Sequence, residues 1–108
     1  MLPAGVRIFV CTSPQDMRRS FERLALAAKE LVGEEPRSGA LFVFVSRTAR
    51  RVKVLWWDRN GYCLLYKRLH QAVFEIPAPE GGRIAVRIDG AQLAQILSGV
   101  SQNQRKKT

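Results

Sequence analysis

The middle of the chain carries two kinds of side chain that could bind an acidic partner. The stretch "VLWWDRNGYCLLYKRL", residues 54–69, places two adjacent tryptophans before a tight turn and ends in basic residues. The basic residues in and around it are Arg47, Arg50, Arg51, Lys53, Lys67 and Arg68. Guanidinium groups match phosphate oxygens through paired hydrogen bonds, and an exposed aromatic ring can stack on a base. These residue types favour a nucleic-acid backbone as the ligand.

The two tryptophans allow two interpretations. Neighbouring side chains of a strand point to opposite faces, so Trp56 and Trp57 cannot share one environment. Only one face of this strand is expected to meet a core helix. One ring would then be buried, and the other would shield the opposite face or a dimer interface. Alternatively, the exposed ring is a stacking platform that contributes about 1 to 3 kcal/mol per base.

Three consecutive strands are expected to position these residues, at 41–46, 51–57 and 62–68. Asn60 and Gly61 both tolerate positive φ, which favours a tight hairpin turn between the second and third strands. In an up-and-down meander, the first turn and the end of the third strand lie at the same end of the sheet. The residues predicted to cluster there are Arg47, Arg50, Arg51, Lys67 and Arg68. A basic sheet end that contacts only solvent is the alternative.

A long amphipathic helix is predicted over residues 13–32. Ser13 is a candidate N-cap, Pro14 suits the first helical position, and Asp16 completes a partial capping box. Apolar residues recur at helical spacing along one face, namely Met17, Phe21, Leu24, Ala28 and Leu31. Gly33 is well placed to end this helix.

The remaining segments complete a small mixed domain. Strands are expected at 6–11 and 83–88, and a second helix at 91–98 with Asp89 as its cap. The predicted fold class is therefore α+β, a mostly antiparallel sheet with a central three-stranded meander and two helices.

Composition limits the size, location and partners of the protein. Its 108 residues suit one domain, predicted over 1–100, followed by a disordered basic tail at 101–108. Eighteen basic residues, thirteen of them arginine, oppose nine acidic ones and give a net charge of +9. No apolar run is long enough to span a membrane, and the N-terminus lacks the pattern of a secretion signal. We therefore expect a cytoplasmic protein with an acidic partner.

Catalytic and metal-binding patterns are absent from the sequence. Cys11 and Cys63 are expected to be buried free thiols, and His70 is the lone histidine, so no metal site is predicted. The three aspartates have local roles at helix starts or turns: Asp16, Asp58 and Asp89. We expect no cofactor and no enzymatic activity, because no acid, base or nucleophile is suitably placed.

Four segments occur in a familiar order and spacing: "DMR", "SGALFVF", "KVLWWDRNGYCLLYKRL" and "FEIP". From about residue 6 to residue 100, the chain closely resembles the small TnpB-type accessory protein of the bacterial insertion-sequence family numbered sixty-six. That protein is unrelated to the RNA-guided nucleases of the same name. The resemblance implies a transposition accessory protein encoded beside a separate, larger transposase that cuts and joins the DNA strands.

Two partner hypotheses follow for such an accessory protein. In the first, the basic cluster binds DNA at or near the element ends and helps assemble the transposase complex. In the alternative, the protein is an adaptor that binds the transposase without contacting DNA, with Trp56 or Trp57 as a hot spot. An RNA-binding or toxin-like module is a third and weaker possibility. A homo-oligomer is compatible with each hypothesis, whereas a membrane partner is not expected.

Overall fold

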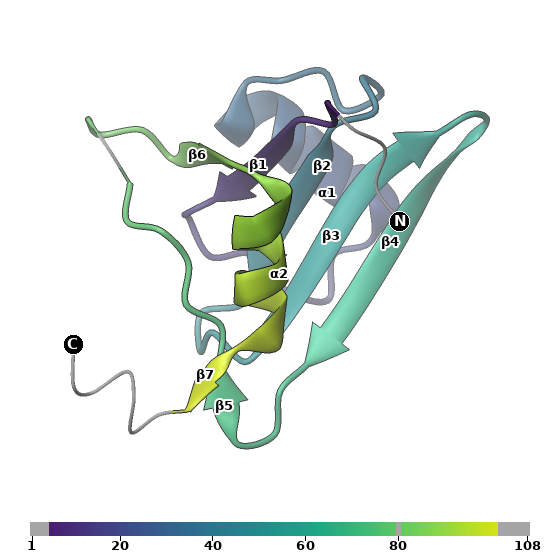
Figure 1. Ribbon diagram of the computed structural model, residues 1–108. Helices are drawn as coiled ribbons and strands as arrows, with labels where there is room; N and C mark the ends of the chain where they lie inside the picture. Colours follow the sequence, from purple (N-terminus) through teal and green to yellow (C-terminus); the bar gives the residue numbers. More distant parts are fainter. Residues whose placement is uncertain (1–4, 80, 102–108) are drawn as a thin grey trace.

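A five-stranded mixed sheet forms the middle layer of the protein, with a helical layer on each face (Figure 1). The computed structural model describes residues 5–79 and 81–101. The sheet strands are β1 (Ile8–Cys11), β2 (Leu41–Val45), β3 (Arg51–Asp58), β4 (Gly61–Arg68) and β6 (Ala85–Ile88), in the order β4-β3-β2-β1-β6. The helices are α1 (Phe21–Ala27), the π-helical η1 (Ala28–Val32) and α2 (Gly90–Ser98). A small separate sheet, which was not predicted, pairs β5 (Ala72–Val73) with β7 (Val100–Ser101).

The predicted fold class and the central meander are confirmed. Strands β2, β3 and β4 pair antiparallel in sequence order, close to the expected boundaries. The hairpin turn differs in one detail: Asp58 pairs with Gly61, so Arg59 and Asn60 form the turn. Arg59 has a φ of 56°, whereas Gly61 belongs to β4 and lacks a positive φ. The prediction that Asn60 and Gly61 supply the positive φ angles is therefore wrong.

The first helix begins later than predicted. Residues 13–20 form a loop, and the helix starts at Phe21 with Ser20 as its N-cap. The backbone N–H of Gln15 donates to the carbonyl of Val45 at 2.9 Å, which keeps this segment beside the end of β2. The Asp16 carboxylate accepts the backbone N–H of Arg18 at 2.9 Å, a local turn that competes with helix formation. The helical region ends as predicted at Gly33, whose φ is 81°.

Each face of the sheet has its own hydrophobic core. Val52 and Val54 of β3 pack in the same cluster as Leu93 and Ile96 of α2. Leu55, on the other face of β3, lies in the cluster that contains residues of α1. The expectation that only one face of β3 meets a core helix is therefore wrong, because α1 and α2 cover opposite faces (Figure 1).

The N-terminal strand joins the meander by a connection that the sequence did not reveal. Strand β1 pairs parallel with β2 and antiparallel with β6. A parallel pair needs a long crossover, which the segment containing α1 and η1 supplies. At the other end of the chain, Asp89 caps α2 as predicted, in a full capping box with Gln92. The hydrogen bond from Gln15 to Val45, described above, places the loop that precedes α1 beside the start of the loop between β2 and β3.

Two further expectations concern the ends of the chain and the membrane. The predicted disordered tail at 101–108 lies outside the described residues except for Ser101, which belongs to β7. Within the described ranges, no helix has the length and apolar character that a membrane span requires.

Candidate nucleic-acid interface

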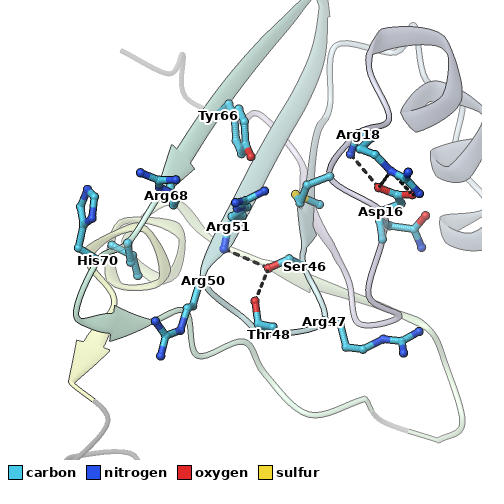
Figure 2. Close-up of a pocket in the computed structure, with 13 residues that line it drawn as sticks. Asp16, Arg18, Ser46, Arg47, Thr48, Arg50, Arg51, Tyr66, Arg68 and His70 are labelled. Atoms are coloured by element: carbon cyan, nitrogen blue, oxygen red, sulfur yellow. Dashed lines mark hydrogen bonds and ion pairs between the residues drawn. The ribbon is translucent and has the colours of Figure 1, made fainter.

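An open hollow of about 990 Å³ lies where β3 begins and β4 ends. Three segments line it: the loop before α1, the loop between β2 and β3, and the end of β4 with the residues that follow (Figure 2). The charged and aromatic side chains around it include Asp16, Arg18, Arg47, Arg50, Arg51, Tyr66 and Arg68. We call this feature the basic hollow, because five arginines surround a single aspartate.

The centre of the basic hollow is a pair of arginines on neighbouring strands. Arg51 of β3 is the direct register partner of Arg68 of β4. The next pair along the ladder is hydrogen-bonded, since the N–H of Leu69 donates to the carbonyl of Arg50 at 2.8 Å. Antiparallel pairs alternate, so Arg51 and Arg68 form a non-hydrogen-bonded pair, in which the side chains lie closest. Like charges placed in this way destabilise a sheet.

Nothing in the described part of the chain neutralises these charges. The two ion pairs found there join Arg7 to Glu34 and Arg18 to Asp16. The four remaining arginines of the basic hollow, Arg47, Arg50, Arg51 and Arg68, make no side-chain hydrogen bond or ion pair within the described ranges. Their donors are therefore available to an external anion.

The loop that carries Arg47 and Arg50 has a fixed backbone. The Ser46 hydroxyl accepts the N–H of Arg51 at 3.1 Å (Figure 2), and the Ser46 N–H donates to the carbonyl of Arg51 at 2.9 Å. The carbonyl of Ala49 accepts the N–H of Phe74 at 2.6 Å. Ala49 itself has a φ of 60°, a conformation that costs a residue with a Cβ about 1 to 2 kcal/mol. The fold thus holds this loop in one shape despite local strain.

Asp16 is the acidic residue on the rim, and Arg18 already neutralises it. The Arg18 guanidinium lies 2.7 Å from the Asp16 carboxylate at the closest atoms. Hydrogen bonds from the Arg18 side chain and backbone hold the pKa of Asp16 well below its usual range, and the same pair raises the pKa of Arg18. Asp16 therefore stays ionised and paired, and it does not compete for the four free guanidinium groups.

Tyr66 is the aromatic ring of the basic hollow, and the sequence reasoning missed it. Its side chain lies on the same face of β4 as Arg68, and 51% of the residue surface is exposed. The Lys53 ammonium lies 4.8 Å from its ring centroid. The alternation of side chains along a strand could have identified Tyr66 as part of the site. Tyr66 precedes Arg68 by two residues, so both side chains lie on one face, and Tyr66 opposes Lys53 in the register.

The two lysines of the predicted site have structural contacts instead. Lys53 is only 6% exposed, and its ammonium donates to the carbonyl of Arg19 at 2.7 Å. Lys67 faces away from the basic hollow, because it is the register partner of Val52, which packs on the α2 side. Its ammonium donates to the carbonyl of Leu97, in the last turn of α2, at 2.6 Å. A cation there also interacts favourably with the helix dipole.

The tryptophans lie at the opposite end of β3. Trp56 lies five positions after Arg51, a distance of about 17 Å along a strand. Trp57 is half-buried, with the Arg37 guanidinium 4.7 Å from its ring and Tyr62 packed edge-on at 5.0 Å. Trp56 packs against the core that contains α2 and lines a second hollow of about 740 Å³. The rings and the basic hollow therefore form two separate surfaces.

The cysteines and acidic residues form no further site in the described ranges. Cys11 is buried, burial raises the pKa of its thiol, and Cys63 is half-buried; both are free thiols. No group of three histidine, cysteine or acidic residues lies close enough to hold a metal ion within 5–79 and 81–101.

Comparison with known proteins gives one family and two relatives. The family model described as "IS66 Orf2 like protein" matches residues 6–107. An uncharacterized protein y4hO of Sinorhizobium fredii is 43% identical over 110 residues, which cover 100% of this chain and 94% of that protein. A second one, y4jC of the same organism, is 27% identical over 103 residues, covering 95% and 86% of the two chains. No solved structure matches.

Proposed function

Because the chain belongs to the IS66 Orf2-like family, and is thus an insertion-sequence-associated accessory protein, we propose that it binds DNA phosphates through the basic hollow. The observation that carries the proposal is the Arg51–Arg68 pair. Two like charges stand opposite each other on a rigid ladder, and neither forms an ion pair within the described ranges, because Asp16 is paired with Arg18. A bound phosphate would turn that repulsion into paired charge-assisted hydrogen bonds.

The geometry supports contact with the backbone of the nucleic acid more than contact with base edges. Arginines held on loop and strand ends can position a phosphate without reading a sequence. Tyr66 adds a half-exposed ring on the same face, where a base from a frayed or single-stranded end could stack. In this proposal the protein holds DNA at or near the element ends for the transposase, and strand cleavage needs no group from this chain.

A second candidate function rests on the hollow beside Trp56. Its lining is largely apolar and includes Leu65 of β4 and Leu93 and Leu97 of α2. A surface of this kind suits a protein partner with an apolar anchor residue, and the transposase is the candidate partner. Trp56→Ala should weaken capture of purified transposase and leave DNA binding intact. Loss of DNA binding in that variant, with transposase capture unchanged, would contradict the division into two surfaces.

The test of the first function compares variants of equal charge. We propose to titrate labelled DNA with the wild-type protein, with an Arg51→Ala/Arg68→Ala variant, and with an Arg83→Ala/Arg87→Ala control. Arg83 and Arg87 are exposed residues outside the basic hollow, so the control loses the same net charge. The proposal requires a clear loss of affinity in the first variant and little change in the control. Equal losses would reduce the binding to general charge attraction.

The DNA in this test should include an element end and a scrambled duplex. Equal affinity for both would mean contact with phosphates alone, whereas a preference for the end would mean that shape or bases are also read. A matched RNA separates the proposal from an RNA-binding module, which would prefer that ligand.

A further inference from the structure

Strand β4 is an edge strand along its whole length. All eight of its residues pair with β3, and the sheet order leaves its other side without a strand in the described ranges. The opposite edge, β6, has only four residues. Figure 1 shows β3 and β4 extending as a hairpin beyond the rest of the sheet. The protein thus has one long edge and one short one.

The register shows which backbone groups face outward from this edge. The hydrogen bond from the Leu69 N–H to the Arg50 carbonyl sets the alternation of the β3–β4 ladder. Gly61, Cys63, Leu65 and Lys67 therefore direct their backbone groups toward β3. The residues whose N–H and C=O groups point outward are Tyr62, Leu64, Tyr66 and Arg68. These four residues offer eight groups to an added strand.

The usual protections of an edge strand are missing from most of β4. Natural edges carry inward charges, prolines or bulges, or are very short. Residues 61–66 contain no charge and no proline, and every residue of the strand keeps its regular partner on β3. Leu65 is 39% exposed and Tyr66 is 51% exposed. An edge of this length and composition is a template for strand pairing.

We propose that β4 pairs antiparallel with β4 of a second copy of this chain, with Leu65 opposite the partner's Leu65. In this register, Leu64 faces the partner's Tyr66, and Tyr62 faces the partner's Arg68. Each outward backbone group then meets a group of the other chain, because a two-fold axis makes the edge complementary to itself. The two five-stranded sheets become one continuous sheet.

Strand overlap and the separation of the two Arg68 residues together favour this register. It places the two copies of Arg68 about six residues apart along the strands, or roughly 20 Å, which exceeds the Debye length of about 8 Å at physiological salt. A register centred on Tyr66 would shorten that separation to about four residues, or roughly 13 Å, and one centred on Lys67 to about two residues, or roughly 7 Å, which is within the Debye length. A register shifted towards Gly61 would leave the end of β4 that carries Arg68 without a full set of partners. The Leu65-centred register gives full overlap without that repulsion.

The dimer has a consequence for the basic hollow, and this one point rests on the proposed DNA binding. The partner's strand runs antiparallel past Arg68, so its hairpin turn reaches the residues that follow β4. The partner's Arg59 would lie beside residues 70–71, and His70 lines the basic hollow. Each basic hollow would thus gain an arginine from the other chain, and the dimer would present two such sites.

A charge swap at Leu65 tests the pairing without DNA. Leu65→Lys and Leu65→Asp each place like charges opposite each other at the two-fold axis, so each variant should be monomeric by sedimentation equilibrium. An equimolar mixture should restore a dimer, because lysine then faces aspartate. Ile84→Lys is the matched control, since Ile84 is equally exposed at 39% and lies far from β4 in the sheet order. It should remain dimeric.

The wild-type protein should sediment as a dimer at about 0.3 M salt, where the repulsion between two chains of charge +9 is screened. A wild-type monomer at high micromolar concentration would overturn the proposal and leave the edge to another occupant, such as an extended segment of the transposase. Persistence of the dimer in both the Leu65→Lys and the Leu65→Asp protein would also overturn the proposal.

Circular dichroism of each variant checks that the fold is retained. Because no DNA is present, failure here leaves the proposed DNA binding untouched.

Discussion

Arg51 and Arg68 face each other across the β3–β4 ladder as a non-hydrogen-bonded pair, and no acidic side chain in the described ranges contacts either one. Like charges in this arrangement oppose folding by a few tenths of a kcal/mol to about 1 kcal/mol. A fold that retains such a pair at the mouth of a hollow keeps positive charge available for a ligand.

The first prediction concerns the conflict between stability and binding. Arg51→Ala/Arg68→Ala should raise the free energy of unfolding slightly, by up to about 1 kcal/mol, because the repulsion disappears. The same change should weaken DNA binding. Urea unfolding and DNA titration on the same preparations check both effects. A variant that is both less stable and weaker in binding would mean that the arginines act mainly in packing.

The second prediction separates Lys53 from the arginines. Lys53→Met removes the hydrogen bond to the end of the loop before α1 and leaves the Arg19 carbonyl without that donor. We expect a loss of about 1.5 to 3 kcal/mol in stability, the range for hydrogen bonds to charged groups. The salt dependence of DNA binding should not change. Lys29→Met, at an exposed position, is the control and should leave stability within about 0.5 kcal/mol of wild type.

The third prediction concerns the Asp16–Arg18 pair and pH. Folding lowers the pKa of Asp16, so its contribution to stability is fully present above the unfolded pKa of about 3.9. That contribution is lost as pH falls below about 4 toward the lower folded pKa. The stability difference between wild type and Asp16→Asn should therefore be constant from pH 5 to 8 and shrink below pH 4. A difference that stays constant down to pH 2 would contradict the pairing.

The fourth prediction concerns the strained loop. Ala49 has a φ of 60°, which glycine adopts freely. Ala49→Gly should relieve about 1 to 2 kcal/mol of strain but lose about 0.5 to 1 kcal/mol through the greater freedom of the unfolded chain. A small net gain in melting temperature is expected. Ala49→Val should be clearly destabilising, since a β-branched residue fits this conformation poorly.

The sequence was a good guide wherever local chemistry decides the structure. Strand-forming segments separated by turn residues located the meander, Asp89 located the start of α2, and Gly33 located the end of the helical region. Each signal acts within a few residues, so it can be recognised without knowing the rest of the fold. The hairpin was also found, although Arg59 rather than Asn60 or Gly61 has the positive φ.

The failures arise where distant contacts decide the structure. Residues 13–20 have the spacing of a helix, but the hydrogen bond from Gln15 to Val45 holds them as a loop. The burial of Lys53 depends on that loop, and the contact of Lys67 depends on the position of α2. Charge and turn geometry predicted a basic sheet end, yet neither indicated which basic side chains already have partners.

The salt dependence of DNA binding tests the central claim most directly. Four free guanidinium groups that each replace a counterion should give a slope of log affinity against log salt of about −3 to −4 on duplex DNA. Arg51→Ala/Arg68→Ala should reduce the magnitude of that slope by about 2, whereas Arg83→Ala/Arg87→Ala should leave it unchanged. A slope that responds equally to both double variants, or to neither, would contradict the basic hollow as the DNA site.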